Sequence, residues 1–461
     1  MAMSKLAGAA AAAAAARGPG WADLPRDLLE SVLGRLPVPD RLRFPAVCAT
    51  WQSADASSPT AARFRAVQPP WLMLPFNPTA RGGGAAAGGR LLEARFLSFS
   101  DGRAYVIPQP APAISERLCV GSSDGWLVTA DDESELQLLN PLTGVQIQLP
   151  SVTTLPFVAA TRDADGRVVS YDLRCCFGDG EALVPPESFA PDMLRFEIYE
   201  KAILVAPPSP SCGGGGYAVM LICQPLYRLA IARAGDTRWT LLDTPSRCWL
   251  DAIRASSNQS VVYTLDTMGR VAAWDIDIDT PTTQPPREIA PPCRGCSTPS
   301  TTTTTPSSKY LVELSPGHLL QIHRIREKSH TKYKWEPRED RVEYTTTNAE
   351  LYEWNTTTAA AAGKWTRVHG CGGGLLAGRA LFLGKSSSTC VPASCCPETR
   401  GNCVYFTDDG PWSHERCHEV VPDVGVLDLA DGSYRVPRGA VRDLLWKWPP
   451  PVWVFPSCDD D

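Results

Sequence analysis

The sequence predicts a mostly β protein that begins with a short helical module. Proline and glycine are frequent, with 42 and 36 residues among 461, and both interrupt helices. After residue 60, short runs of Val, Ile, Leu and Tyr alternate with glycine-containing turns, and long helical periods are missing. Between residues 21 and 58, by contrast, leucine recurs at the period of a helix. We therefore expect a small helical domain followed by a large β domain.

The composition excludes several classes of protein. The chain has no run of 18 or more strongly apolar residues, so no membrane span is expected. A net charge of −6 and a pI near 5.7 give no whole-protein signature of nucleic-acid binding. With 20% charged residues and 14 Trp, the chain is too aromatic and too weakly charged to be disordered throughout.

Residues 1–20 form an alanine-rich leader that contains eight consecutive alanines, Ala9 to Ala16. Its apolar stretch has Leu6 as its strong hydrophobe and is otherwise nearly all alanine, unlike the core of a signal peptide. We expect a disordered leader on an intracellular protein of the cytoplasm, the nucleus or both. The 16 cysteines are a moderate number for this length and are expected to be reduced thiols.

A leucine-rich stripe indicates the first helix of the module. Asp23 can cap its start, and Pro25 fits the first turn, where the missing N–H costs nothing. Pro37 and Pro39 end the helix. Positions four residues apart carry Leu24, Leu28, Val32 and Leu36, and the stripe is widened by Leu29 and Leu33.

Two further short helices are expected before residue 58. Asp40 offers a cap before Arg41–Phe44, and Pro45 can open a third helix that includes Trp51. Three short helices of this length cannot bury all of these leucines internally. The module therefore needs an external surface to pack on.

The module is similar to an F-box. The matching residues are Leu24-Pro25-x-x-Leu28-Leu29-x-x-Val32-Leu33-x-x-Leu36, then Asp40-x-Leu42-x-Phe44, then Val47-Cys48-x-x-Trp51. In that family the motif docks on the Skp-type adaptor of a cullin-based SCF ubiquitin ligase. The resemblance implies that the adaptor-facing surface or its supporting core consists of Leu24, Pro25, Leu28, Leu29, Leu33, Leu36, Val47, Cys48 and Trp51.

One residue of the module departs from the family pattern. Pro45 stands where the family more often has a polar residue, which could shorten the second helix and weaken docking. The alternative to an F-box is a small helical hairpin that belongs to the main domain.

The long body of the chain reads as a series of β-hairpins. Val261–Leu265 and Arg270–Asp275 flank the turn Asp266–Gly269, and Tyr310–Leu314 pairs in the same way with Leu319–His323. A β-meander of this length must avoid exposed edges, and radial repetition into a propeller achieves that. Paired β-sandwiches are the alternative, and the degenerate repeats leave the number of blades open.

Four stretches are expected to be surface insertions rather than blades, because their Gly, Ala, Pro or Thr content cannot pack a core. They lie near residues 81–89, 211–216, 281–308 and 356–363.

The body is also similar to a signature of plant F-box proteins. Its strongest blocks are Gly121-Ser-Ser-Asp-Gly-Trp-Leu-Val128 and Leu138-Leu-Asn-Pro-Leu-Thr-Gly144. Further matches in order are Leu311–Glu313, Leu381–Gly384, Asn402–Asp409, Gly425–Leu429 and Trp448–Pro456. In that family the C-terminal region is a KIB-type propeller, long described as a domain of unknown function. The resemblance implies an F-box at 21–60 and a KIB-type propeller at 61–458.

Several motifs for catalysis or metal binding fail in their context. His414–His418 matches H-E-x-x-H, but it lies in a short segment between prolines and has no third ligand downstream. Gly378–Ser386 is too long for a phosphate-binding loop and reads as a strand with a turn. A thin cluster of thiols and one imidazole gives no zinc spacing: Cys395, Cys396, Cys403, Cys417 and His418.

Two further features have plain interpretations. Cys293-x-x-Cys296 lies in a Pro/Thr-rich stretch without a second CxxC pair. The run His323–Arg341 has seven Lys or Arg against four acidic residues, and it is interpreted as a solvated strand and loop.

The two resemblances together imply a substrate-recognition subunit of an SCF-type ubiquitin ligase, which is not itself an enzyme. Its expected partners are a Skp-type adaptor, a cullin reached through that adaptor, and an unknown target protein bound by the propeller. No catalytic residue, metal or cofactor is expected, and neither nucleic acid nor a membrane is expected as a partner. The alternative is a non-ligase propeller that binds a protein or ligand and carries a degenerate F-box.

Overall fold

The computed structural model divides the chain into two compact units, Met1–Gln68 and Pro69–Pro456. The predicted boundary between residues 60 and 61 lies outside the described residues. The structure describes residues 20–36, 38–58, 69–75, 92–175, 185–208, 216–242, 247–278, 280, 284–293, 307–331, 341–355, 363–368, 374–409, 423–437 and 448–456.

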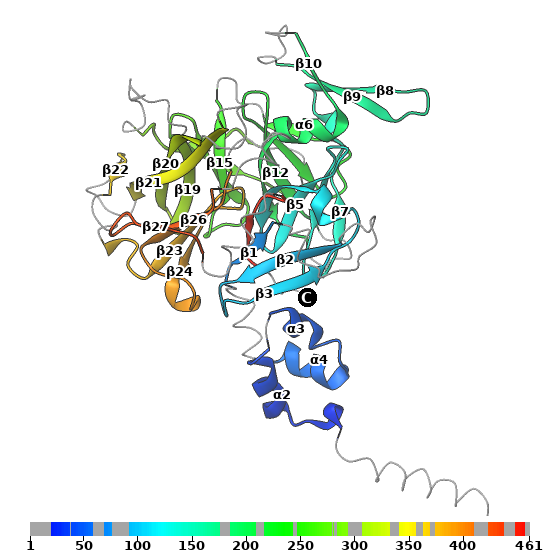
Figure 1. Ribbon diagram of the computed structural model, residues 1–461, viewed down its shortest axis with the longest axis vertical. Coiled ribbons are helices and arrows are strands. Elements are labelled where there is room, and N and C mark those ends of the chain that lie inside the picture. The colour runs from blue at the N-terminus through cyan, green and yellow to red at the C-terminus, as the bar shows by residue number, and fades with distance from the viewer. Residues whose placement is uncertain are drawn as a thin grey trace, which may run out of the picture. The chain divides into compact units, whose positions relative to one another are not determined.

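The first unit consists of short helices around a small apolar core (Figure 1). Phe44 and Trp51 pack with their rings tilted by 40° and their centroids 4.5 Å apart, and Leu29, Leu33 and Ala54 complete the buried cluster. The elements are the 3₁₀ helix η1 (Trp21–Asp23) and the α-helices α2 (Arg26–Leu33), α3 (Val38–Arg43) and α4 (Ala49–Ala56).

The starts of these helices differ from the sequence prediction. Pro25, not Asp23, is the residue before α2, and the Asp23 carboxylate instead accepts a hydrogen bond from the Gly20 N–H at 2.9 Å. Asp40 lies inside α3 rather than capping a helix. Pro45 lies in the turn after α3, and α4 begins only after Cys48. The sequence does not identify the exact capping residue, because several polar and proline residues lie within two positions of each helix start.

The second unit is built mainly of antiparallel sheets of four or five strands, which confirms the mostly β propeller expected from the sequence. The first sheet of the ring contains β28 (Val452–Val454), β1 (Trp71–Leu74), β2 (Glu93–Ser98) and β3 (Ala104–Pro108). The second contains β4 (Leu118–Ser123), β5 (Trp126–Ala130), β6 (Leu136–Leu139) and β7 (Gln146–Gln148). The third contains β11 (Tyr199–Ala206), β12 (Ala218–Cys223), β13 (Arg228–Arg233) and β14 (Thr240–Leu242).

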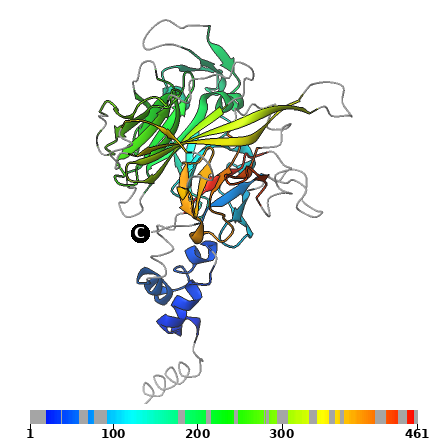
Figure 2. The ribbon, with the colours of Figure 1, turned by 90° about the vertical axis from the view of Figure 1, so that its left-hand side faces the viewer.

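The next three sheets follow in chain order. The fourth sheet contains β15 (Trp249–Arg254), β16 (Val261–Asp266), β17 (Val271–Asp275) and β18 (Arg287–Ala290). The fifth contains β19 (Ser307–Ser315), β20 (His318–Thr331), β21 (Arg341–Asn355) and β22 (Thr366–Arg367). The sixth contains β24 (Thr389–Pro392), β23 (Arg379–Leu383), β25 (Cys403–Phe406), β26 (Gly425–Asp428) and β27 (Tyr434–Arg435). Figure 2 shows the long β20–β21 hairpin extending beyond the strands beside it.

The sheets form a closed ring. Along the inside of the ring, β28 contacts β4, β4 contacts β11, β11 contacts β15, β15 contacts β19 and β19 contacts β24. The sixth sheet then packs on the first through a shared apolar cluster that includes Phe382 and Trp453. The ring is closed within the first sheet, where the C-terminal β28 pairs with the N-terminal β1. The closed ring protects the inner edges of the sheets, and radial repetition of this kind leaves only short edges, which is the physical reason for this architecture.

A glycine permits the closest approach inside the ring. A Cβ atom on Gly121 of β4 would lie 1.9 Å from the Ala202 carbonyl oxygen of β11. Any other residue would therefore push two neighbouring sheets apart.

A smaller sheet and a helix lie between the second and third sheets of the ring in the chain. The helix α6 (Pro191–Ile198) ends directly at β11 and buries Leu194 and Ile198. The strands are β8 (Val158–Arg162), β9 (Val168–Leu173) and β10 (Glu187–Phe189), and the remaining short turns are η2 (Ile114–Glu116), η3 (Val152–Thr154) and η7 (Ala393–Cys395).

The predicted hairpins are confirmed, and one predicted insertion is wrong in part. β16–β17 and β19–β20 pair where the sequence placed them, and Gly378–Ser386 contains the strand β23. Within 281–308, however, Arg287–Ala290 forms the outer strand β18, and Ala290 is buried. The composition of Arg287–Ala290 does not predict a strand, but hydrogen bonding to β17 stabilises the segment as one.

Several sequence expectations lie outside the described residues. These are the leader apart from Gly20, the insertion near 81–89, most of those near 211–216 and 356–363, and the H-E-x-x-H segment at 414–418.

Candidate docking surface and buried ion pairs

Exposed apolar side chains on the first unit mark the candidate docking site. The helical period of α2 turns Leu29 and Leu33 into the core and leaves Leu28 outside. Leu28 is 48% exposed and Val47, in the turn before α4, is 55% exposed. A small unit that exposes large apolar side chains has a surface suited to a partner.

The nine residues predicted for adaptor docking separate by burial. Leu29, Leu33 and Trp51 are buried and form the supporting core, so they do not present a surface of their own. The partly buried residues are Leu24, Leu36 and Cys48, and the exposed ones are Pro25, Leu28 and Val47.

Sequence reasoning missed Trp21 as a surface residue. Its side chain is 74% exposed, the most exposed large apolar side chain among the described residues. Its carbonyl oxygen accepts a hydrogen bond from the Trp51 indole at 2.9 Å, which fixes η1 to α4. Trp21 could have been recognised from the sequence, because it precedes the leucine stripe and is not one of the periodic positions that form the helix core.

Part of the basic run that the sequence analysis interpreted as solvated is buried. The structure describes the side chains of residues 323–327 of this run, and among these Glu327 is exposed while the three basic ones are buried. His323, Arg324 and Arg326 of β20 are 6%, 1% and 4% exposed. For these three residues the interpretation was wrong, because the fifth and sixth sheets pack face to face over β20. A strand with alternating basic residues is normally exposed, and only distant acidic partners make its burial tolerable.

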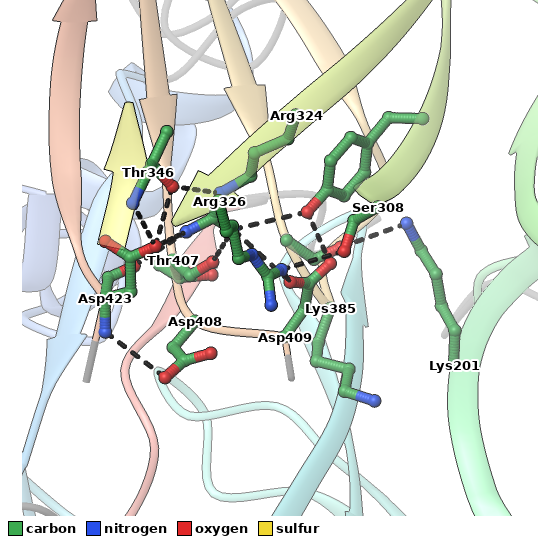
Figure 3. Close-up of polar contacts among 12 residues, drawn as sticks. Lys201, Ser308, Arg324, Arg326, Thr346, Lys385, Thr407, Asp408, Asp409 and Asp423 are labelled. Atoms are coloured by element: carbon green, nitrogen blue, oxygen red, sulfur yellow. Dashed lines mark hydrogen bonds and ion pairs between the residues drawn. The ribbon is translucent and has the colours of Figure 1, made fainter. Parts of the chain in front are cut away.

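Arg324 is the centre of an ion-pair cluster between these two sheets (Figure 3). Its guanidinium donates to Asp423 Oδ2 at 2.8 Å and to the Thr407 carbonyl oxygen at 2.8 Å. Asp423 Oδ2 also accepts from the Thr346 N–H at 3.0 Å and from its hydroxyl at 2.6 Å. The guanidinium lies over the Phe406 ring, 4.1 Å from its centroid. Such a cluster holds two sheets in one register.

Asp409 is the second acid of the cluster. It pairs with Arg324 and Arg326 and accepts a hydrogen bond from the Tyr310 hydroxyl. Burial acts to raise the pKa of Asp409, but Arg326 and Arg324 outweigh it and lower the pKa to about 2. Burial raises the pKa of Tyr310 well above its usual range, so this phenol remains a donor.

A second buried ion pair joins four sheets near the inner strands. Lys201 Nζ of β11 lies 2.6 Å from Asp251 Oδ1 of β15 and donates to the Gly384 carbonyl oxygen at 3.1 Å. Asp251 Oδ2 accepts from the Leu311 N–H at 2.8 Å and from the Ser388 hydroxyl at 3.0 Å. Both charged groups of this pair are hydrogen-bonded to further groups of the protein, which is typical of an ion pair that stabilises the fold.

The described residues offer no arrangement for metal binding. They contain no group of three or more His, Cys, Asp or Glu side chains that could hold a metal ion. Burial raises the pKa of Cys403 and Cys396 to about 11, which keeps these thiols protonated and unreactive. Within the same residues, no helix is long and apolar enough to cross a membrane.

Comparison with known families decides what the two units are. The family model described as the KIB1-4 β-propeller matches residues 96–428, and that of the F-box domain matches residues 21–54. The chain belongs to the KIB1-4 β-propeller family and carries an F-box domain at its front. An F-box domain in general implies binding to a Skp-type adaptor, and F-box and propeller domains are typical of non-catalytic adaptors.

Two relatives from Arabidopsis thaliana agree with this assignment. A protein named F-box/kelch-repeat protein is 24% identical over 275 residues, which cover 59% of this chain and 57% of the relative. A protein named putative F-box protein is 28% identical over 154 residues, or 33% of this chain and 36% of the relative. The chain thus spans less than two thirds of the length of either relative. These relatives, with the two domains, support an F-box adaptor role.

Solved structures of similar arrangement are more distant. A chain of the nidogen–laminin complex is 10% identical, with 62% of this chain and 89% of that chain covered and a TM-score of 0.28. A TM-score this low supports no conclusion about the present chain.

Proposed function

We propose that this protein is a substrate-recognition subunit of an SCF-type ubiquitin ligase. The observation that carries the proposal is the F-box domain with its exposed residues Leu28 and Val47, held on a buried core and followed in the chain by a propeller. The exposed face binds a Skp-type adaptor and through it a cullin, and the propeller binds the target protein. The subunit acts in the cytoplasm, the nucleus or both.

The proposed mechanism is tethering rather than catalysis by this chain. When one subunit holds the target and another holds the charged ubiquitin-conjugating enzyme, transfer between them becomes effectively intramolecular. A high local concentration and a favourable orientation then accelerate the reaction without an active-site residue in the adaptor. A rigid propeller suits this task because it holds the target at a defined position.

Docking is tested by substitutions on the exposed face. Leu28→Asp and Val47→Asp place a carboxylate where an apolar contact is expected, and each should weaken adaptor binding by about 2 kcal/mol or more. Affinity is measured by titration of the purified Skp-type adaptor against the full chain. Val106→Asp is the matched control, because Val106 lies on the propeller and is 56% exposed, almost the same as Val47.

Two outcomes would contradict the proposal. The first is wild-type protein that fails to bind the adaptor, or full affinity in the Leu28→Asp, Val47→Asp double variant. The second is a reconstituted complex with adaptor, cullin and conjugating enzyme that leaves captured target unmodified. Adaptor binding without ubiquitin transfer would instead indicate a protein- or ligand-binding role outside the ligase.

A further inference from the structure

A polar cavity of about 230 Å³ opens beside the inner strands of the propeller. It lies where β4 and β11 begin, and the loop between β12 and β13 supplies another wall. Lys385, which follows β23 in the sixth sheet, completes the lining. Residues of three sheets of the ring therefore meet in its wall. The polar residues of the lining include Glu197, Glu200, Gln224, Tyr227 and Lys385.

Three charges in the cavity do not cancel. Lys385 Nζ donates to the Glu200 carbonyl oxygen and lies 3.8 Å from a Glu200 carboxylate oxygen. Gln224 Nε2 donates to the other carboxylate oxygen of Glu200 at 2.8 Å. Glu197 of α6 is exposed, and its carboxylate has no hydrogen bond or ion pair to the parts of the chain that the structure describes. Two carboxylates therefore face one ammonium group.

The surroundings of Glu197 oppose its negative charge. The carboxylate of Glu197 is only partly shielded from solvent, but this partial burial raises its pKa, and the carboxylates of Glu187 and Glu200 raise it further. A cation placed between these groups would remove that repulsion and gain charge-assisted hydrogen bonds. The lining therefore favours a cation beside Glu197.

The backbone beside the cavity is strained. Leu226 and Tyr227 are successive non-glycine residues with φ of 70° and 51°, in the left-handed region. Backbone strain of this kind is often found at binding sites. The Tyr227 carbonyl oxygen is held by the Trp249 N–H at 3.0 Å, so the strained loop is fixed in place. The result is an aromatic side chain in the wall of an acidic cavity.

We propose that this cavity binds a basic side chain, lysine or arginine, of the target protein. At roughly 30 Å³ per water molecule the cavity has room for several waters, and such a side chain would replace them. Glu197 and Glu200 accept its N–H groups, and Tyr227 offers a ring to its cationic end. The identification of the bound protein as a ubiquitination target rests on the proposed function above; the basic-side-chain chemistry does not.

The test uses the full chain and a displayed library of random peptides. Peptides that the wild-type protein selects should be enriched in lysine or arginine at one position. A selected peptide, labelled and titrated, should bind Glu197→Lys at least about tenfold more weakly and Glu197→Gln more weakly by a smaller factor. Its counterpart with the basic residue replaced by glutamine should lose affinity for the wild type by a similar factor.

The matched control is Asp165→Lys, which makes the same charge change in the exposed turn between β8 and β9. It should leave peptide affinity unchanged, and thermal unfolding should confirm that all three variants are folded. No enrichment, an acidic or apolar consensus, or equal affinity in Glu197→Lys would overturn the assignment. Titration of the adaptor on the same preparations distinguishes the two proposals. Adaptor binding without binding of basic peptides would refute this site alone. Binding of basic peptides without adaptor binding would refute the ligase role alone.

Discussion

At the scale of single residues, His323 shows how burial changes the chemistry of a side chain. It lies on β20 beside the Tyr352 ring, with centroids 4.7 Å apart, and within 3.3 Å of Gln321 Oε1. Burial, with a smaller contribution from Lys309, lowers the pKa of His323 to about 3. The folded protein therefore keeps this imidazole neutral at pH values where the unfolded chain, with a pKa near 6.5, is protonated.

This neutral histidine predicts a pH dependence of stability. Because the folded pKa is below the unfolded value, the unfolded chain binds the extra proton, and stability falls as the pH decreases from about 6.5 toward 3. Between pH 7.5 and pH 5 the loss should be about 2 kcal/mol. His323→Gln should remove that part of the slope in urea unfolding measured at both pH values. An unchanged slope would show that this imidazole titrates normally.

At the scale of elements, Arg324 decides how the fifth and sixth sheets meet. Arg324→Met leaves Asp423 buried without its cation, and this should lower the free energy of unfolding by about 3–5 kcal/mol. Asp423→Asn should also destabilise, but the double variant should lose less than the two single losses combined. Chemical unfolding of all three variants measures the coupling.

An exposed ion pair in the same sheet provides the control. Arg367 is 49% exposed at the side chain and pairs with Glu350 at 2.6 Å. Arg367→Met should cost less than about 1 kcal/mol, since solvent screens such pairs. Equal losses at Arg324 and Arg367, or strictly additive losses at Arg324 and Asp423, would show that the buried cluster does not hold the two sheets together.

At the scale of the whole molecule, closure of the ring depends on the C-terminal strand. Trp453 of β28 is fully buried and packs against Phe99 and Phe382, with ring centroids 5.4 and 5.0 Å away. Phe99 follows β2 of the first sheet and Phe382 lies in β23 of the sixth. One side chain thus joins the two ends of the ring.

Removing that side chain should open the ring at its closure. Trp453→Ala should lower the free energy of unfolding by about 3–5 kcal/mol, since it leaves a large cavity between two sheets. Trp453→Phe should retain part of the stability, and Val106→Ala on the exposed face of β3 should change it little. Thermal unfolding followed by near-ultraviolet circular dichroism provides the comparison. A ring that melts unchanged in Trp453→Ala would refute closure through β28.

The sequence by itself determined the features that depend on neighbouring residues. The leucine period of α2, the hairpins β16–β17 and β19–β20, and the order of F-box and propeller are all visible in short stretches of chain. Helices and hairpins form between residues a few positions apart, so short stretches of sequence are enough to predict them.

Only the tertiary structure decided which of these residues face outward and which charges are buried. Leu28 and Leu29 are adjacent in an almost uniform leucine stripe, yet one is exposed and the other lies in the core. Arg324 meets Asp423 across 99 positions, and β1 meets β28 from the other end of the chain. Such contacts form between segments that composition and spacing do not connect, because ring closure brings them together only in the folded chain.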